Sequence, residues 1–212
     1  MKFNRLVEDV SATDAIYEGT KLIRVNPAVT EFTIKEGTTE IAVHAFAHCY
    51  GLTKITIPSS VKVIGISAFT DCPLKEIVVP EGVEELQFFV FSHCNELEKV
   101  TLPGTLKKIG PGIFHHCYKL REVVLNEGIT EISGRLFDHC FALERISLPN
   151  TLKHIGEWAF HQCEKLDRLD IPESVTQIDD YAFARCSSLT DVSFSDYTKL
   201  GTNIFFETPL ED

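Results

Sequence analysis

The chain has 212 residues, of which 44% are hydrophobic and 24% are charged. This length and composition are enough to bury one sizeable core. The formal net charge is −11, with 20 Lys and Arg against 31 Asp and Glu, and no run of basic residues is present. These values argue against nucleic acid and anionic membrane surfaces as partners, because both are bound through clustered positive charge that releases counterions.

The first 25 residues lack the periodicity of the rest of the chain. They contain no apolar region of the length a signal peptide needs, and no stretch of the sequence approaches the roughly 18 apolar residues of a membrane-spanning helix. We therefore expect no membrane insertion and a cytoplasmic chain as the sequence is written, or a secreted or cell-surface one if it is part of a longer protein. Residues 1–25 are expected to cap the repeats that follow with their apolar side chains, which are Phe3, Leu6, Ile16, Tyr17, Leu22 and Ile23.

A repeat of 22 or 23 residues fills positions 26–208, and residues 209–212 form the C-terminal end. A fixed period of this length predicts one supersecondary unit stacked on copies of itself. Seven cysteines mark the repeat, each three residues after a phenylalanine, and they are Cys49, Cys72, Cys94, Cys117, Cys140, Cys163 and Cys186. The phenylalanine column comprises Phe46, Phe69, Phe91, Phe114, Phe137, Phe160, Phe183 and Phe205.

One repeat, residues 97–117, reads LEKVTLPGTLKKIGPGIFHHC. Apolar and polar residues alternate over its first six positions, which predicts a half-buried strand. A proline ends the strand in several repeats, since no ladder N–H is needed from it there. A shorter apolar pair predicts a return segment on the opposite wall, and Phe and Cys are expected on one face of a single helical turn.

The phenylalanine and cysteine columns are predicted to be structural. A large aromatic side chain in every turn is expected to form a stacked spine in the core. A thiol beside loop carbonyls offers a small buried side chain with a weak donor. Equivalent thiols on parallel strands point the same way, and an odd number does not suit a disulfide framework, so we expect seven free, buried cysteines.

The pattern AF-x-x-C-x-x-L-x-x-[IV]-x-[IL]-P-x-x-[VL]-x-x-I-G resembles the BspA-like, or Treponema-type, leucine-rich repeat over roughly residues 26–208. The resemblance implies an α/β-type repeat solenoid that is mostly β. It would be a right-handed horseshoe of about eight turns, with a concave parallel sheet and with short strands or helical turns on the far wall. The resemblance implies no catalytic residue and no cofactor. Many family members are bacterial surface proteins implicated in adhesion to host proteins.

Two outward columns of the predicted sheet are candidates for contact with a partner. One column carries side chains of nearly alternating charge and includes Arg145 and Arg168. The other column carries mostly small side chains and includes Val78 and Val124. Opposite charges on neighbouring strands stabilise a sheet by about 0.2–1 kcal/mol per pair. We therefore interpret this face mainly as solvent-exposed surface whose opposite charges neutralise one another. Contact with a partner is the alternative.

Large aromatic residues precede the repeat phenylalanine at positions expected to face outward. Phe88 and Phe89 are adjacent in one repeat, and Trp158 and Tyr181 occupy the same position in two neighbouring repeats. A contiguous exposed apolar patch indicates an interface. Trp158 and Tyr181 are the favoured anchor, whereas Phe88 and Phe89 have the alternative of tucking under a turn or against the cap.

Histidines gather just before the cysteines. The periodicity places His115, Asp138 and His161 in one column and His116 beside His139 in the next. Imidazole and carboxylate groups at one strand spacing are able to hold a transition metal. We nevertheless favour ordinary polar surface and predict no bound metal, because two outward positions in each turn are expected to be polar in any case.

The sequence contains none of the local catalytic motifs: no GxSxG, no Walker-type glycine loop, no HExxH and no CxxC pair. It therefore predicts a non-enzymatic module for protein–protein interaction, with a partner of unknown identity. Two alternatives stay open. One is a fragment of a bacterial cell-surface adhesin that binds host matrix or glycoprotein, and the other is a structural unit that assembles end to end through its terminal sheet edges.

Overall fold

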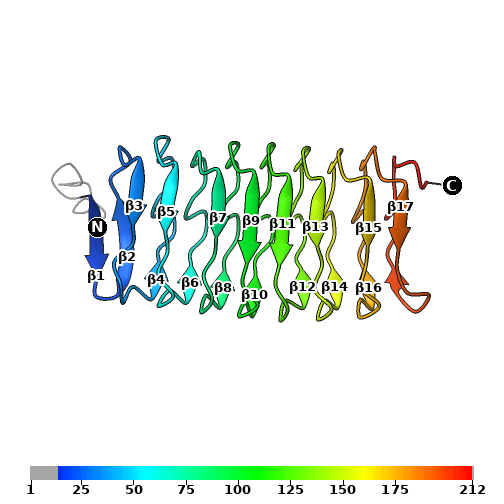
Figure 1. Cartoon of the computed structure of the whole chain (residues 1–212), viewed down its shortest axis with the longest axis horizontal. Coiled ribbons are helices and arrows are strands. Elements are labelled where there is room, and N and C mark those ends of the chain that lie inside the picture. The colour runs from blue at the N-terminus through cyan, green and yellow to red at the C-terminus, as the bar shows by residue number, and fades with distance from the viewer. Residues whose placement is uncertain (1–13, 212) are drawn as a thin grey trace, which may run out of the picture.

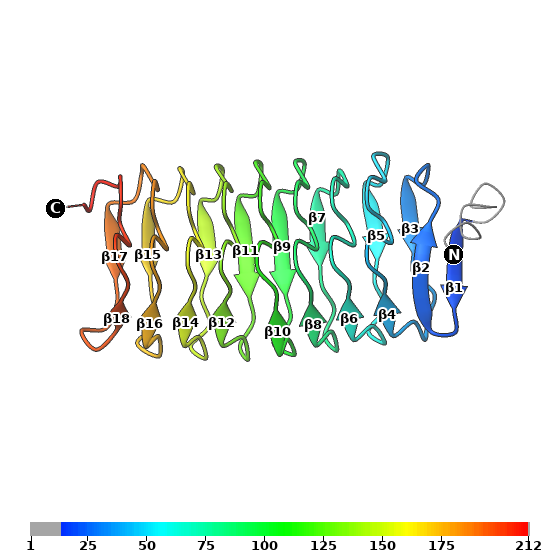
Figure 2. The ribbon, with the colours of Figure 1, turned by 180° about the vertical axis from the view of Figure 1, so that it is seen from behind.

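The computed structural model describes residues 14–211 as one stack of turns that follow each other in sequence order (Figure 1). After the first turn, each turn contributes a strand of three or four residues to one wall and a strand of two residues to another. Both walls are also visible from behind (Figure 2). The stack runs almost straight in these views, so the horseshoe curvature expected from the sequence is slight over these turns (Figure 1). The handedness of the coil stays a prediction.

The long-strand wall contains one strand from each successive turn. Its strands are β3 (Glu31–Thr33), β5 (Lys54–Thr56), β7 (Glu76–Val78), β9 (Lys99–Leu102), β11 (Glu122–Leu125), β13 (Arg145–Ser147), β15 (Arg168–Asp170) and β17 (Asp191–Ser193). Their apolar residues face the core and alternate with polar ones, as the period of two predicts; in β9 and β11 alternate residues are buried.

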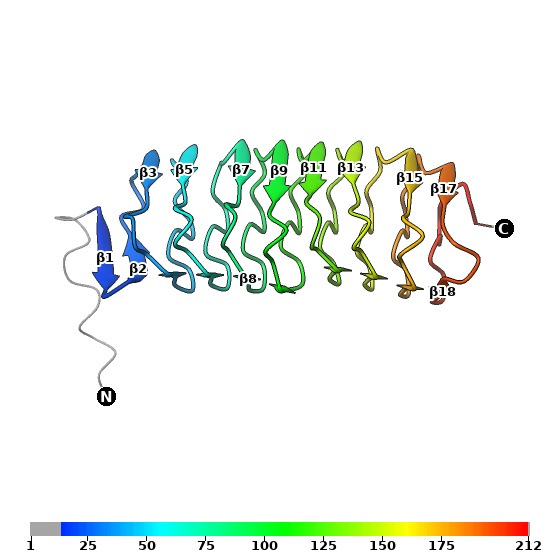
Figure 3. The same cartoon turned by 60° about the horizontal axis from the view of Figure 1, so that its bottom comes forward.

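The short-strand wall lies across the core from the long-strand wall (Figure 3). It begins with β2 (Lys21–Val25), and its two-residue strands are β4 (Glu40–Ile41), β6 (Val63–Ile64), β8 (Glu85–Leu86), β10 (Lys108–Ile109), β12 (Glu131–Ile132), β14 (His154–Ile155), β16 (Gln177–Ile178) and β18 (Lys199–Leu200). Paired strands in both walls are parallel and in register one repeat apart, as where Glu122 of β11 pairs with Lys99 and Arg145. The short strands expected opposite the main sheet are therefore present.

Both walls are interrupted, but at different turns. The long-strand wall is divided between β5 and β7 and between β13 and β15, whereas the short-strand wall is divided between β10 and β12. The first interruption coincides with a repeat that is a residue shorter: Leu74 comes two positions after Cys72, whereas Leu52 comes three positions after Cys49. The parallel pairing from β6 to β8 continues across that point.

The N-terminal part of the described chain is a β-hairpin. β1 (Ala15–Glu18) pairs with β2 in the antiparallel direction and so covers the first edge of the short-strand wall. Leu22 is fully buried, while Ile16, Tyr17 and Ile23 are half-buried. The other two apolar residues expected in the cap, Phe3 and Leu6, lie outside the described residues.

The segment that runs from the short strand to the cysteine forms a third side of the stack, here called the turn wall. The helical turn predicted for it is wrong: residues 14–211 contain no helix. Successive β-turns fold this segment, and the residues two before and two after the phenylalanine have positive φ, such as Trp158 at 58° and Gln162 at 56°. Alternate N–H groups then donate to the next turn, as from Phe160 to the carbonyl of Ala182 at 2.8 Å. The turn wall is therefore a third hydrogen-bonded ladder.

The phenylalanine column is the spine of the core, as predicted. Seven of its rings, Phe46 to Phe183 in repeat order, are fully buried. Neighbouring rings are stacked with centroids 4.7–5.8 Å apart, through to the half-buried Phe205 at the C-terminal end. Offset stacking of this kind adds about 0.5–1.5 kcal/mol per pair beyond the burial of apolar area.

The cysteines are free and buried, which confirms the prediction for all seven. In six of the seven, the thiol donates to the carbonyl oxygen of the phenylalanine one turn earlier, with Sγ–O distances of 3.0–3.3 Å, as from Cys140 to Phe114. Burial raises the pKa of the Cys49 thiol to about 11, and it raises the pKa of the Cys94 and Cys117 thiols well above the usual value. These thiols are therefore small structural donors with little thiolate character.

We expect the folded protein to resist thiol chemistry. Fewer than about one thiol per chain should react with a chromogenic disulfide reagent at pH 8, since the thiolate is the reactive form, whereas all seven should react after denaturation. The free energy of unfolding measured with urea should be the same with and without dithiothreitol. A loss of structure on reduction would contradict the assignment of free thiols.

Candidate functional site

The turn wall carries a compact group of titratable side chains, the histidine–aspartate cluster. Its members are His93, His115, His116, Asp138, His139 and His161. The ladder of the turn wall aligns neighbouring turns, because the N–H of His116 donates to the carbonyl of Asp138 at 2.9 Å. The structure thus brings together the five residues named from the sequence and adds His93 to them.

Asp138 is the buried centre of this cluster, with 1% of its side chain exposed. Its Oδ1 accepts hydrogen bonds from Nδ1 of His139 at 2.6 Å and from Nδ1 of His161 at 2.7 Å. Its Oδ2 lies 3.4 Å from Nε2 of His115 and 3.6 Å from a guanidinium nitrogen of Arg135. Groups from three neighbouring turns therefore surround one carboxylate.

The surroundings of Asp138 keep it ionised. Burial alone would raise the pKa of this carboxyl, but hydrogen bonds from His115 and His161 and the charges of His139 and His161 oppose burial and hold the pKa well below its usual range. A buried carboxylate that accepts from Nδ1 of an imidazole fixes that ring with its Nε2 lone pair free. His139 and His161 are held in this way.

Aromatic and imidazole rings form a continuous surface over the turn wall, here called the aromatic belt. One row of contacts runs from Phe89 through His115 and His116 to Tyr118 and Phe141, with centroid distances of 3.9–6.0 Å. A second row joins it through the contact between His116 and His139 at 4.4 Å and then continues along the turns. The rings of this second row are His139, His161, Trp158, Tyr181 and Phe206.

Trp158 and Tyr181 lie side by side, as their equivalent positions in neighbouring repeats predicted, but neither is as exposed as expected. Their rings are stacked, with centroids 4.3 Å apart and an interplanar angle of 3°, and both side chains are half-buried. The guanidinium of Arg135 lies 5.9 Å from the Trp158 ring centroid, within reach of a cation–π interaction. Trp158 and Arg135, together with His139, His161 and Phe206, line a hollow of about 270 Å³.

Phe88 and Phe89 remain at the surface, with 51% and 38% of each residue exposed. Both lie over glycines of the next turn: a Cβ on Gly110 would come within 2.7 Å of the Phe88 ring, and one on Gly112 would clash with the ring of Phe89. The rings are therefore seated against backbone and keep an outer face open. The alternative that they tuck under a turn or against the cap is wrong.

Comparison with protein families identifies the repeat. The profile described as BspA type Leucine rich repeat region matches in six copies, over residues 25–144 and 107–212. The chain belongs to this family. The match covers the three-walled stack, so the family relationship and the fold agree.

Solved structures of bacterial leucine-rich repeat proteins are similar to this BspA-type chain. One from Bacteroides ovatus is 27% identical with a TM-score of 0.80, and the match covers 84% of this chain and 46% of the other. One from Eubacterium ventriosum is 29% identical with a TM-score of 0.73, and the match covers 87% of this chain and 50% of the other. The T. pallidum leucine-rich repeat protein is 26% identical with a TM-score of 0.60, over 69% and 82% of the two chains.

The chain spans about half the length of the first two of these structures. A search of curated proteins finds no match. Within residues 14–211, no helix has the length and apolar character to cross a membrane.

Backbone conformation explains part of the histidine pattern in these BspA-type repeats. His48, His93, His116 and His139 occupy the left-handed position just before the cysteine, with φ between 59° and 62°. Histidine, like Asn and Asp, is enriched at positive φ. That preference does not extend to His115 and His161, which lie one residue earlier and have no positive φ. Their presence beside Asp138 therefore needs a reason other than the backbone.

The candidates on the long-strand wall are accessible but lie apart from the aromatic belt. Val78 is 57% exposed and Val124 is half-buried. Arg145 donates to Glu122 at 3.0 Å, and Arg168 lies 4.0 Å from a carboxylate oxygen of Asp191 on the next strand. Charge pairing along this wall follows the alternation seen in the sequence, so its arginines are partly neutralised by their neighbours.

Sequence reasoning missed four members of the belt and cluster. Tyr118 and Phe141 both follow a cysteine directly and stack at 5.2 Å, so the column after the cysteine would have revealed them. Phe206 follows the last repeat phenylalanine, where no other turn has a phenylalanine, tyrosine or tryptophan. His93 shares a column with His116 and His139, and its ring stacks on His116 at 4.8 Å.

The metal-free cluster should make stability pH-dependent. Burial, and then the neighbouring imidazoles His115, His139 and His93, lower the pKa of His116 to about 4. In the unfolded chain this ring binds a proton below about pH 6.5, whereas in the folded state it stays neutral down to about pH 4. The contribution of neutral His116 to the free energy of unfolding is therefore fully present above about pH 6.5 and is lost as the pH falls toward 4.

We expect His116→Gln to reduce this loss by about 1–2 kcal/mol between pH 7 and pH 4.5, allowing for screening at a half-buried ring. Glutamine is the matched substitute, since Gln162 occupies the same position in a later turn with φ of 56°. Urea unfolding of both proteins at a series of pH values gives the comparison. Equal pH profiles would contradict the prediction.

Proposed function

We propose that the protein is a non-enzymatic module that binds another protein through the aromatic belt of its turn wall. The leucine-rich repeat scaffold is typical of protein-interaction modules, and the family match places this chain among such scaffolds. Aromatic side chains are enriched at the centres of protein interfaces, where they contribute large contact area at low entropic cost.

The observation that carries the proposal is the unbroken ring-to-ring contact from Phe89 to Phe206 across successive turns. The backbone beneath these rings is tied to its neighbours by the ladder of the turn wall. A rigid surface loses little conformational freedom on binding, which favours affinity. The long-strand wall, with its paired charges, lacks a comparable apolar surface within residues 14–211.

The test uses a belt variant that preserves the fold. Trp158→Asn with Tyr181→Asn is suitable, because Asn203 occupies the same column with φ of 52° and asparagine tolerates this conformation. Immobilised wild-type protein, the belt variant and a control variant, Val78→Thr with Arg168→Gln on the long-strand wall, are exposed to extracts and secretions of the source and its host. Circular dichroism and thermal unfolding establish that all three are folded.

We expect a protein partner that the wild type and the control variant capture and that the belt variant captures at least tenfold less. Capture by the belt variant but not by the control would move the binding surface to the long-strand wall. Failure of the wild type to capture any protein, together with concentration-dependent size in solution, would favour end-to-end assembly instead. A captured host matrix protein or glycoprotein would favour the adhesin alternative.

A further inference from the structure

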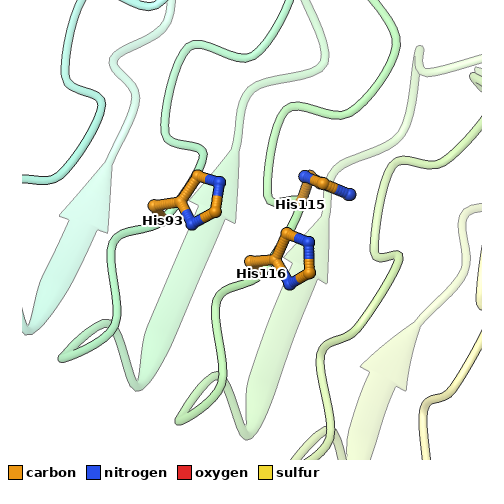
Figure 4. Close-up of side chains that lie close together, drawn as sticks. All are labelled: His93, His115 and His116. Carbon is orange, nitrogen blue, oxygen red and sulfur yellow. The ribbon is translucent and has the colours of Figure 1, made fainter.

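We propose that His93, His115 and His116 form a binding site for one divalent transition-metal ion, with zinc the favoured occupant. This inference concerns a metal ligand and stands independently of the protein partner proposed above. The three imidazoles come from two neighbouring turns of the turn wall, two of them from consecutive residues of one turn (Figure 4). Imidazole nitrogen is a preferred ligand of zinc, copper and nickel.

The three rings are already close enough to share an ion. One nitrogen of each lies within 4.8 Å of the others, and Figure 4 shows the rings gathered around a common space. Zinc binds imidazole nitrogen at about 2.0–2.1 Å, so two ligands of a tetrahedral site lie roughly 3.3 Å apart. Closing the site therefore requires the nitrogens to approach by roughly 1–1.5 Å, through changes of side-chain rotamer. It also requires the stacked rings of His93 and His116 to rotate, because the lone pair of an imidazole nitrogen lies in the plane of its ring.

Two outer partners orient the ligands. Nε2 of His115 lies 3.4 Å from Oδ2 of the buried Asp138, which leaves Nδ1 of His115 for the ion. Nδ1 of His116 lies 3.0 Å from the Tyr118 hydroxyl oxygen, which leaves Nε2 of His116 for the ion. Carboxylate and hydroxyl groups commonly hold the second nitrogen of a metal-bound histidine in this way, fixing its tautomer and raising its basicity.

Among the histidines of the cluster within residues 14–211, only His93 has a ring with neither a hydrogen bond nor an ion-pair contact. Its ring packs instead on His116 at 4.8 Å and against the edge of His115 at 5.8 Å. An ion bound here would be coordinated by the His93 imidazole and by the free nitrogens of the other two rings. Three protein ligands leave a fourth position of a tetrahedral ion for water or an outer group.

A second set, His115, Asp138 and His139, also has ligand atoms within 4.8 Å. Its carboxylate, however, already accepts from His139 and His161 and lies beside Arg135. An ion there would have to displace hydrogen bonds of 2.6 and 2.7 Å at a buried group. We therefore assign the ion to the three histidines and give Asp138 a positioning role.

The experiment titrates metal-free protein with Zn²⁺ in a calorimeter and with Co²⁺ in a spectrophotometer at pH 7.5. His93→Gln and His116→Gln remove one ligand each while keeping a residue that Gln162 shows to be compatible with this position. His48→Gln is the matched control. His48 occupies the same column, but its Nδ1 lies 3.0 Å from Asp71 and it is not part of the cluster.

We expect one equivalent of Zn²⁺ per chain in the wild type and in His48→Gln, and binding at least tenfold weaker in His93→Gln and in His116→Gln. Co²⁺ should give a visible absorption band that both ligand variants lose. Absence of saturable binding near one equivalent, or equal affinity in wild type and ligand variants, would overturn the proposal. Loss of binding in His139→Gln with retention in His93→Gln would overturn the assignment to this set of ligands. Thermal unfolding of each metal-free variant separates loss of a ligand from loss of the fold.

Discussion

Replacing Phe114 with alanine is expected to lower the free energy of unfolding by about 3–5 kcal/mol. The Phe114 ring is fully buried and is stacked between Phe91 and Phe137, with centroid distances of 5.7 Å and interplanar angles of 4° on both sides. Truncation removes both ring contacts and leaves a cavity. The neighbouring rings cannot collapse into it readily, because each is itself held by the next ring of the spine.

The matched control is Phe205→Ala. Phe205 belongs to the same column, but it is only half-buried and stacks on a single ring of the column, Phe183, at 5.8 Å. Its truncation should cost about half as much or less, since solvent can fill the space. Urea unfolding followed by far-UV circular dichroism measures both. Equal losses in the two variants would contradict the prediction, because Phe114 exceeds Phe205 both in burial and in the number of stacked rings.

Gly128→Ala is expected to lower the free energy of unfolding by about 2–4 kcal/mol through the backbone alone. Gly128 has φ of 111°, a conformation that L residues rarely adopt. A Cβ added there would clash with the carbonyl oxygen of Gly104 on the preceding turn, and the Cα of Gly104 would be only 3.2 Å away. Two neighbouring turns approach so closely here that both positions need glycine.

Two further variants separate conformational strain from steric overlap. Gly37 has a φ of 83°, but a Cβ added there would meet no atom within 4 Å, so Gly37→Ala should cost only about 1–2 kcal/mol of strain. Gly104 has no positive φ, but its Cβ would clash with the carbonyl oxygen of Glu127, so Gly104→Ala tests overlap alone. Urea unfolding compares the three variants. If Gly37→Ala proved as costly as Gly128→Ala, the close approach of the turns would not be the cause.

The period of the sequence was sufficient to predict the stack, the two sheet walls and the core columns. Alternation such as that of Val100 and Leu102 identifies a strand, and a fixed spacing puts equivalent residues side by side. The helical turn was mispredicted because Phe and Cys three residues apart suit a helix and a series of β-turns equally well. The distinguishing signal is the recurrence of residues that tolerate positive φ, such as His93 and Asp71, just before the cysteine.

The candidate site was predicted only in part. The repeat spacing predicted that His115 and His161 lie beside Asp138. It could not show that Asp138 is buried and accepts a hydrogen bond from Nδ1 of His161 at 2.7 Å. Burial of a polar group and the direction of a ring nitrogen depend on the packing of three turns at once. Partner identity is not encoded in the period at all, because one scaffold carries unrelated binding surfaces.

Three hydrogen-bonded sides make the repeat tolerant of changes in its own length. Where one residue is missing after Cys72, the long-strand wall is divided, yet β6 still pairs with β8 and the N–H of Phe69 still donates to Val90 at 2.9 Å. Two intact sides hold the alignment that the third has lost. An insertion or deletion confined to one side should therefore be absorbed within that turn. Repeats can then differ in length by single residues without a shift of strand register in the turns that follow.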